Sequence, residues 1–225
     1  MAATILLSGG LDSTILLHFV ARERPEEPLY LLSFDYGQRH NRELDMARWQ
    51  ARQVPAVAEH RVVDMSMLAE LLGNSSALLT TGESVPDLSE IAPDQRAQPP
   101  TYVPHRNLIL LSLAAAYAES RKCPNVYYGA QAHDQYGYWD CTPEFIRRAN
   151  SLLALNRSIP VTIKAPFAEM SKADEILLGQ KLGVDFSKTW SCYRGDKTPC
   201  GSCPTCVERS NAFKQAGISD PLMKP

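Results

Sequence analysis

The residues best suited to chemistry lie near the start of the chain, at positions 8–13 (SGGLDS). An apolar run at 4–7 predicts a strand before them, and residues 14–17 predict a helix after them, so the glycines form the turn between the two. Two glycines let the main chain approach a ligand closely, and the N–H groups at a helix N-terminus favour anions. We therefore expect this loop to bind a nucleotide phosphate, with an ordinary glycine turn as the alternative.

The loop differs from two better-known phosphate motifs. No lysine follows its glycines, as G-x-x-x-x-G-K-[ST] requires, and the pattern G-x-G-x-x-G is absent. The hydroxyls of Ser8, Ser13 and Thr14 add hydrogen-bond donors to the main-chain N–H groups. The residues expected at the nucleotide are Leu7, Ser8, Gly9, Gly10, Leu11, Asp12, Ser13, Thr14, Ile15, Leu16 and Leu17.

Four cysteines toward the other end have the spacing of a metal site: Cys192, Cys200, Cys203 and Cys206 form C-x7-C-x2-C-x2-C. Four thiolates suit tetrahedral Zn²⁺ with no open position, so we expect a structural zinc site. An iron–sulfur cluster is the alternative, but the C-x3-C-P setting of ferredoxin motifs is absent. Bound zinc would hold the C-terminal segment against the rest of the protein.

The elements that must position these groups follow an alternating pattern of apolar strands and amphipathic helices. This predicts an α/β fold, with a doubly wound, mainly parallel sheet of five strands. The expected strands are 2–7, 29–34, 61–64, 126–129 and 161–164. The expected helices are 13–22, 41–53, 106–120, one capped by Thr142, one capped by Ser171, and 204–217. Residues 1–189 would form the nucleotide-binding domain, with a long loop or lid at 73–104, and 190–225 the zinc-binding segment.

Polar segments follow the strands, where an α/β sheet binds its ligand. Arg39 and Arg106 lie in two of them, and a guanidinium suits either a phosphate or a carboxylate. Lys164 ends the fifth strand and Lys172 begins the next helix, so both are cations expected near phosphate. For Lys172 the alternative is a solvated helix face.

Composition limits the class of protein. A hydrophobic fraction of 44% with 21% charged residues is typical of a folded globular chain. No apolar run is long enough for a membrane span, and the chain begins with a strand instead of a charged leader, so we expect a soluble, cytoplasmic protein. The net charge of −2 argues against a broad nucleic-acid surface and favours a small-molecule substrate.

The hexapeptide resembles the SGGxDS loop of the N-type ATP pyrophosphatases (PP-loop enzymes), which split ATP between the α and β phosphates and leave an adenylate. Together with the cysteines, it makes the chain resemble the 7-cyano-7-deazaguanine synthases over essentially its whole length. The segments that carry the resemblance are 8–13, 34–40 (FDYGQRH), 103–107 (VPHRN), 138–141 (YWDC), 144–145, 189–193 (TWSCY) and the cysteine knuckle followed by Arg209.

The resemblance implies an ATP-dependent ligase of queuosine biosynthesis that converts 7-carboxy-7-deazaguanine and ammonia to the nitrile. The carboxylate and then the amide would be adenylated, with AMP and pyrophosphate released. ATP, Mg²⁺ and Zn²⁺ would be required, the enzyme would be a homodimer, and ammonia would come free or from an external donor. Asp12, Arg106 and Lys164 are the expected catalytic residues, with Asp12 orienting the loop or helping to place Mg²⁺.

Substrate contacts are expected from Arg39, Asp134, Tyr138 and Asp140. Either aspartate would accept the N–H donors of a guanine-like edge, and an aromatic residue of the same segment would stack on the ring. Candidate bases for ammonium are His40, His105 and His133.

Two departures from the family pattern fall in the same segment, because Trp139 replaces the usual proline and His133 precedes Asp134. They bear on which base is bound. The alternatives are a PP-loop tRNA-thiolating enzyme, which would need Cys123 or Cys141 to carry sulfur, and a non-catalytic nucleotide-sensing zinc-knuckle protein.

Overall fold

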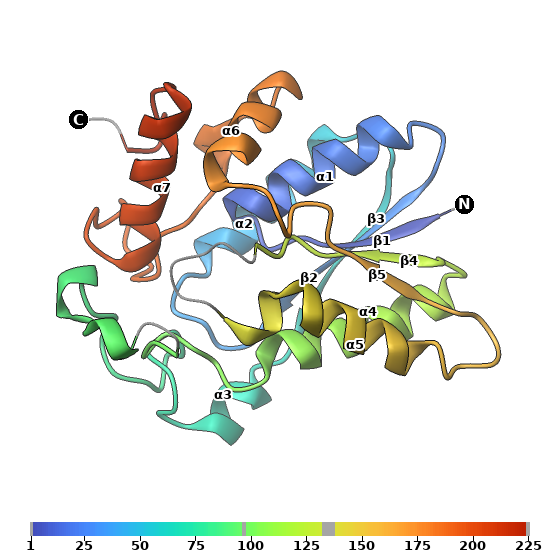
Figure 1. The fold of residues 1–225 in the computed structure, drawn as a ribbon, viewed down its shortest axis with the longest axis horizontal. Helices are drawn as coiled ribbons and strands as arrows, with labels where there is room; N and C mark the ends of the chain where they lie inside the picture. The colour runs from blue at the N-terminus through green and yellow to red at the C-terminus, as the bar shows by residue number, and fades with distance from the viewer. Residues whose placement is uncertain (1, 96–97, 132–137, 224–225) are drawn as a thin grey trace.

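A computed structural model describes residues 2–95, 98–131 and 138–223. Its centre is a five-stranded sheet in the order β3-β2-β1-β4-β5, in which every neighbouring pair is parallel (Figure 1). The strands are β1 (Ala3–Leu6), β2 (Leu29–Asp35), β3 (Val57–Asp64), β4 (Asn125–Tyr127) and β5 (Thr162–Lys164). The chain winds outward from β1 in both directions, which is the doubly wound α/β arrangement expected from the sequence.

Helices cover both faces of the sheet (Figure 1). They are α1 (Leu11–Glu23), α2 (Arg42–Gln53), α3 (Met67–Leu72), α4 (Arg106–Ser120), α5 (Pro143–Leu153), α6 (Lys172–Lys181) and α7 (Pro204–Ala216). Side chains of β1 alternate between two cores: Ala3 and Ile5 pack with α1, α2, α6 and α7, whereas Leu6 packs with α4 and α5. A central strand buried on both faces explains the continuous apolar run at the start of the chain.

Several predicted boundaries are confirmed by their caps. The hydroxyl of Thr142 accepts a hydrogen bond from the N–H of Phe145 at 3.2 Å, and that of Ser171 accepts one from Asp174 at 3.1 Å. Helix α4 has the predicted bounds. Two expectations are corrected: β3 begins four residues earlier than expected, at Val57, and α3 was not expected at all.

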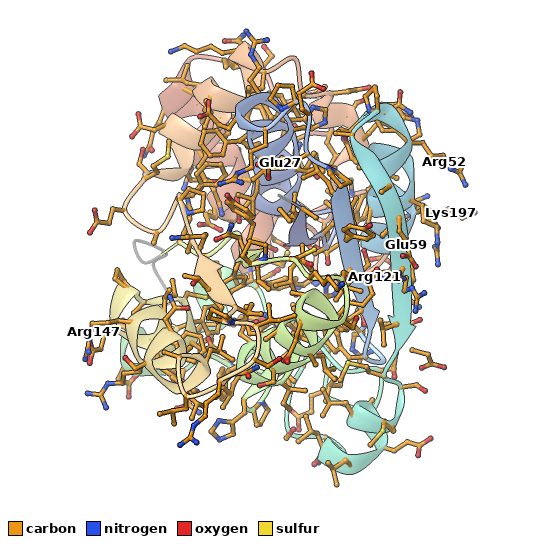
Figure 2. All side chains as sticks on the ribbon, turned by 90° about the vertical axis from the view of Figure 1, so that its right-hand side faces the viewer. Glu27, Arg52, Glu59, Arg121, Arg147 and Lys197 are labelled. Carbon is orange, nitrogen blue, oxygen red and sulfur yellow. The ribbon has the colours of Figure 1, made fainter. Side chains whose placement is uncertain are left out.

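The early start of β3 reflects its place at the edge of the sheet. Only one side of the strand is paired, so its residues are half-buried or exposed, and charged side chains dilute the apolar pattern. Figure 2 shows Glu59 of this strand beside Arg121, and the two side chains form an ion pair of 2.5 Å. Charges on an edge strand discourage pairing with a second sheet.

Residues 73–104 pack against the body of the protein over much of their length. The side chains of Leu78, Leu79, Val85 and Ile91 are almost fully buried, and two short 3₁₀ turns, η1 (Leu88–Glu90) and η2 (Pro93–Gln95), lie in the second half of the segment. The segment is therefore an ordered wall of the molecule along these residues.

The C-terminal segment returns to the sheet side that carries α1 and α2. Helix α7 packs on α6, and its Arg209 is buried with two hydrogen bonds to the carboxylate of Asp220, at 2.7 and 2.9 Å. Within the described parts of the chain, no helix has the length and apolar character needed to cross a membrane.

Candidate active site

A cavity of about 260 Å³ opens beyond the carboxyl ends of β1, β2 and β4. The strand order changes direction between β1 and β4, and such a switch point is where doubly wound sheets bind ligands. Four segments distant in sequence line the cavity: the SGGLDS loop, the residues after β2, the start of α4, and residues 190–209. These include most of the polar segments that the sequence marks as a site.

The SGGLDS loop is shaped by its glycines and serines. Gly9 has a φ of 89°, and a Cβ placed on it would stand 1.9 Å from the carbonyl oxygen of Glu43. The hydroxyl of Ser13 accepts hydrogen bonds from the N–H groups of Ser8 and Gly9, at 3.1 and 3.3 Å. Only glycine fits at position 9, because both the backbone conformation and the neighbouring helix exclude a side chain.

The structure narrows the set of residues expected at the nucleotide. Leu7, Ser8, Gly10, Leu11, Asp12 and Ser13 line the cavity. Thr14, Ile15, Leu16 and Leu17 have no exposed surface, lie in α1 and are not among the residues that line the cavity. The physical reason is the helical turn, which points these side chains into the core once α1 has begun.

Lys172 of α6 is the cation nearest the loop. Its ammonium group lies 2.8 Å from Oδ2 of Asp12 and 3.7 Å from Oε1 of Glu208, and all three side chains line the cavity. Burial alone would lower the pKa of Lys172, but the charges of Asp12, Glu208 and Glu175 outweigh it and raise the pKa, so the group stays charged.

Behind Asp12 lies Glu175, which is fully buried and accepts a hydrogen bond from Gln131. Burial and then the charge of Asp12 raise the pKa of Glu175 well above its ordinary value. Oδ1 of Asp12 and Oε2 of Glu175 are buried and receive no N–H or hydroxyl donor from the described residues, and the two carboxyl groups hydrogen-bond each other through the proton that Glu175 retains. Oxygen atoms of this kind suit a hard cation, which would take the place of that proton.

Arg106 presents a guanidinium to the cavity. Its Nη1 donates to the hydroxyl of Tyr36 at 3.0 Å and its Nε to Oδ1 of Asn107 at 3.2 Å. Burial raises the pKa of Tyr36, so the hydroxyl stays neutral. In the described part of the chain no carboxylate lies within ion-pair distance of Arg106. The side chain can therefore bind an anionic ligand group.

The residues after β4 form another part of the wall. Tyr138 lines the cavity, and its hydroxyl shares a hydrogen bond of 3.0 Å with Thr101. Cys141 also lines the cavity, with Sγ 3.5 Å from the hydroxyl of Tyr128. Asp140 is only 2% exposed and is not part of the lining, and burial raises its pKa. Asp134, His133 and Tyr136 lie outside the described residues.

Two predicted site residues do not reach the cavity. Arg39 directs its guanidinium at the 73–104 segment, donating to the carbonyl oxygens of Ala77 and Glu83 at 3.2 Å each and to that of Gly82. Lys164 is exposed at the end of β5, because the neighbouring Ile163 takes the buried face and strand side chains alternate. Neither side chain is therefore placed at the cavity in this structure.

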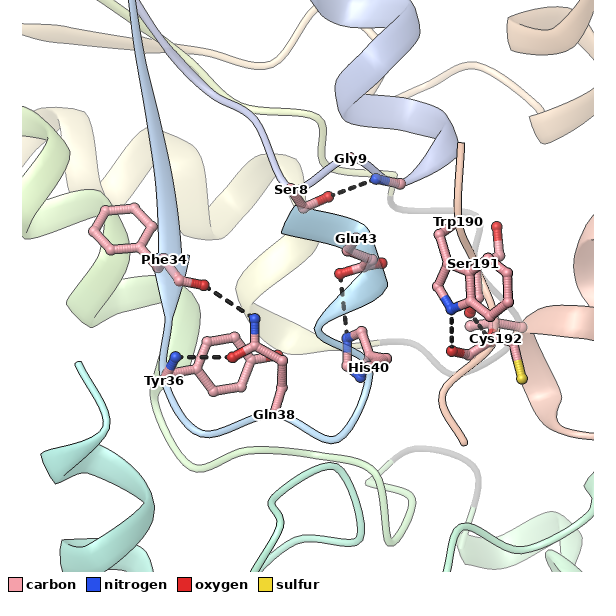
Figure 3. Close-up of polar contacts among 12 residues, drawn as sticks. Ser8, Gly9, Phe34, Tyr36, Gln38, His40, Glu43, Trp190, Ser191 and Cys192 are labelled. Carbon is pink, nitrogen blue, oxygen red and sulfur yellow. Dashed lines mark hydrogen bonds and ion pairs between the residues drawn. The ribbon is translucent and has the colours of Figure 1, made fainter. Parts of the chain in front are cut away.

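Figure 3 shows His40, which the sequence predicts as a candidate base, with Gln38 and Glu43, to which no specific role was assigned. Gln38 accepts from the N–H of Tyr36 at 2.8 Å and donates to the carbonyl of Phe34 at 3.1 Å, which shapes the turn after β2. His40 and Glu43 form a pair of 3.2 Å between Nε2 and Oε2. These five residues all line the cavity. Four of them, all except Phe34, lie in residues 35–43. The many polar residues in this stretch directly after a strand are the feature of the sequence that could have identified them.

The four cysteines predicted as metal ligands come together. Their Sγ atoms all lie within 4.8 Å of one another, and Cys200 and Cys206 are 3.9 Å apart. A tetrahedral ion with Zn–S bonds near 2.3 Å places its sulfurs roughly 3.8 Å apart, so the arrangement fits a metal ion. The site also contacts the loop through Trp190, whose indole N–H donates to the carbonyl of Cys192 at 2.9 Å (Figure 3).

Comparison with known proteins gives one family. The family model described as queuosine biosynthesis protein QueC matches residues 2–217. A protein of Caldicellulosiruptor saccharolyticus named 7-cyano-7-deazaguanine synthase is 41% identical over 224 residues, which cover 99% of this chain and 95% of the relative. One of the same name from Archaeoglobus fulgidus is 42% identical over 224 residues, covering 99% and 90%.

Solved structures share the fold at low identity. The U34-tRNA thiolase NcsA from Methanococcus maripaludis, with its [4Fe-4S] cluster, superposes with a TM-score of 0.51 at 14% identity, covering 96% of this chain and 65% of that one. NMN synthetase from Francisella tularensis gives a TM-score of 0.50 at 14% identity, covering 97% and 78%. At this identity the likenesses show a shared fold.

Proposed function

The chain belongs to the QueC family of queuosine biosynthesis proteins, and from that membership we propose that it converts 7-carboxy-7-deazaguanine and ammonia to 7-cyano-7-deazaguanine with the use of ATP. The observation that supports this most directly is the cavity at the sheet's switch point. Its wall combines a glycine loop at a helix start with Arg106 and Lys172, which are cations suited to phosphate and carboxylate groups.

A carboxylate reacts poorly with ammonia because its leaving group would be oxide. In the proposed reaction a carboxylate oxygen attacks the α-phosphorus of ATP, pyrophosphate leaves, and the acid becomes an acyl adenylate. The N–H groups of the SGGLDS loop would hold the phosphates, and Arg106 would neutralise the α-phosphate or orient the carboxylate. The protein's contribution is placement and charge stabilisation.

The nitrile needs a second activation. Ammonia displaces AMP from the acyl adenylate and gives the amide, whose oxygen attacks a second ATP in the same way. Loss of AMP and of both nitrogen-bound protons then forms the C≡N bond. Both adenylations need the same phosphate-binding site, so the single site with Lys172 beside Asp12 would bind ATP in each of the two steps. We place Lys172 in the cationic role expected of Lys164.

Two metal ions fit the donor groups described above. The buried oxygens of Asp12 and Glu175 would hold Mg²⁺, which would offset charge on the phosphates. The four clustered thiols would hold Zn²⁺ in a closed structural site, which would keep the 190–206 segment against the loop.

The test is direct product analysis. Purified protein is incubated with 7-carboxy-7-deazaguanine, ATP, Mg²⁺ and ammonium, and the products are identified by mass spectrometry. We expect the nitrile with AMP and pyrophosphate, and loss of all three on Asp12→Asn. Asp45→Asn, an exposed residue of α2, is the matched control. Release of ADP and phosphate, or no product from the acid, would refute the proposal.

A further inference from the structure

The carboxylate of Glu43 stands beside the glycine loop with the ring nitrogen of His40 as its hydrogen-bond partner. Its Oε1 lies 3.4 Å from where a Cβ on Gly10 would be, and the side chain is 15% exposed and lines the cavity. Among the described residues no lysine or arginine comes within ion-pair distance of it. A negative group at this place repels the phosphates expected in the loop, so it requires a cation as a partner.

His40 contacts this carboxylate and orients it. Its ring is 2% exposed, packs against Tyr193 with ring centres 5.4 Å apart, and places Nε2 3.2 Å from Oε2 of Glu43. When Nε2 carries the hydrogen, it donates to Glu43, and Nδ1 is then a buried acceptor with no partner in the described part of the chain. An unpaired buried acceptor is destabilising, so its presence in this pair calls for an explanation such as a functional role.

We propose that Glu43, oriented by His40, binds the ammonium ion and accepts its proton. This inference rests on the proposed function, since it names the site of one of that reaction's substrates. An ammonium ion offers four N–H donors and one positive charge, and Oε1 of Glu43 is an anionic acceptor between the cavity and the loop. The ion would also cancel the repulsion between Glu43 and the phosphates.

Amide formation from ammonium and the acyl adenylate is a single displacement. As one ammonium proton passes to Glu43, the nitrogen lone pair attacks the carbonyl carbon of the acyl adenylate, so a C–N bond forms. The C–O bond to AMP breaks and AMP leaves with the electron pair. The nitrogen loses a second proton to the departing phosphate and becomes the amide, and Glu43 returns its proton to solvent. Glu43 is then a catalytic residue and His40 a positioning residue.

Hydroxylamine separates this role from general damage to the site. It is uncharged at neutral pH and traps an acyl adenylate as the hydroxamate, so it needs neither a cation site nor a base. In Glu43→Gln we expect kcat/KM for ammonium to fall by about 10²-fold, the usual contribution of a positioned base. Hydroxamate formation and acid-dependent pyrophosphate release, both measured without ammonium, should stay at or above the wild-type level, because the variant lacks the charge that repels the phosphates. Asp45→Asn on the same helix should change none of these.

The pH dependence gives a second readout. As the pH rises, more of the added ammonium is free ammonia, so the deficit of Glu43→Gln relative to wild type should shrink. Tyr193, Tyr36 and the Arg106 bound to Tyr36 are ionisable groups against the pair, and all three residues are retained in the variant. Because the charge of Glu43 helps to raise the pKa of Tyr36, variant and wild type are compared at pH values well below about 10, the ordinary pKa of a tyrosine.

For the positioning role, His40→Gln keeps an N–H donor for Glu43 and should retain more ammonium-dependent activity than His40→Ala, with His18→Gln as the control outside the cavity. Wild-type ammonium kinetics in Glu43→Gln would overturn the inference. So would equal losses of amide and hydroxamate, because they would show that Glu43 merely shapes the loop. If wild type itself forms no hydroxamate and releases no pyrophosphate, the proposed function fails and the inference with it.

Discussion

The main-chain N–H of Trp190 donates to the carbonyl oxygen of Gly9 at 3.0 Å, and this bond joins the first loop of the sheet to the cysteine segment. The indole of Trp190 is 2% exposed and donates in turn to the carbonyl of Cys192. Arg42 packs over the same ring at 5.0 Å. The glycine loop and the four-cysteine site are thus neighbours joined by a buried tryptophan.

Removing the metal should therefore weaken nucleotide binding. Chelation, or Cys203→Ser, would remove the metal ion proposed to hold residues 192–206 together, and Trp190 would then be less firmly held against the loop. We expect the metal content to fall and the Kd for ATP to rise by at least about tenfold. Elemental analysis and calorimetry on the same samples measure the two quantities. Serine at Cys141, outside the cluster, should leave the metal content unchanged. Unaltered ATP affinity in metal-free, folded protein would contradict this coupling.

Gly9→Ala should be far more damaging than Gly183→Ala. Both glycines have positive φ, 89° and 75°, so both variants suffer the left-handed backbone strain of about 1–2 kcal/mol. At Gly183 a Cβ meets nothing within 4 Å, whereas at Gly9 it would stand 1.9 Å from the carbonyl oxygen of Glu43 and must displace α2. Overpacking of this kind adds about 1–3 kcal/mol.

Urea unfolding of the two glycine variants measures the difference, and pyrophosphate release should be lost in Gly9→Ala alone. Equal unfolding free energies for the two variants would show that α2 can move away from the added Cβ without loss of stability. In that case the close approach of Glu43 to the loop would not limit the residue at position 9.

His60 should make the fold less stable in mild acid. Burial, with a smaller contribution from Arg48, lowers its pKa from 6.5 to about 4, and its Nε2 shares a hydrogen bond of 2.8 Å with Ser33. The unfolded chain takes up this proton near pH 6.5 but the native protein only near pH 4. The stabilising effect is thus complete above 6.5 and is lost as the pH falls between these values.

In His60→Gln, which keeps an amide beside Ser33, the free energy of unfolding should fall less steeply between pH 6.5 and 4 than in wild type. The difference between the two curves should be of order 1–3 kcal/mol at the acid end. Denaturant titrations at several pH values provide it, and parallel curves would rule out His60 as the source.

Features that depend on residues close together in the chain were predicted correctly. The SGGLDS loop, the caps Thr142 and Ser171, and the cysteine spacing each depend on residues close together in the chain, and the structure confirms the turn, the caps and the cluster. The polar segments that follow the strands lie together around the cavity, as expected, because the carboxyl ends of parallel strands meet at one edge of the sheet. The class of fold followed from the same alternation.

Individual side chains in those segments were harder to place. Arg39 and Arg106 are both arginines after a strand, but the carbonyls that hold Arg39 belong to the 73–104 segment, whose path has no periodic signal. The bond between Trp190 and Gly9 joins opposite ends of the chain, and no spacing rule reports such a pair. The six-residue helix α3 is too short for its periodicity to be decisive.

The two lysines at the end of β5 and the start of α6 allow a matched test of the site. Lys172 lies between Asp12 and Glu208 at the cavity, whereas Lys164 is exposed on the strand. Lys172→Met should lower kcat/KM for acid-dependent pyrophosphate release by about 10²–10³-fold, because it removes a positive charge where phosphate charge develops and leaves Asp12 unpaired. Lys164→Met should match wild type. If instead Lys164→Met is the impaired variant, β5 supplies the cation and our placement of the phosphate site is wrong.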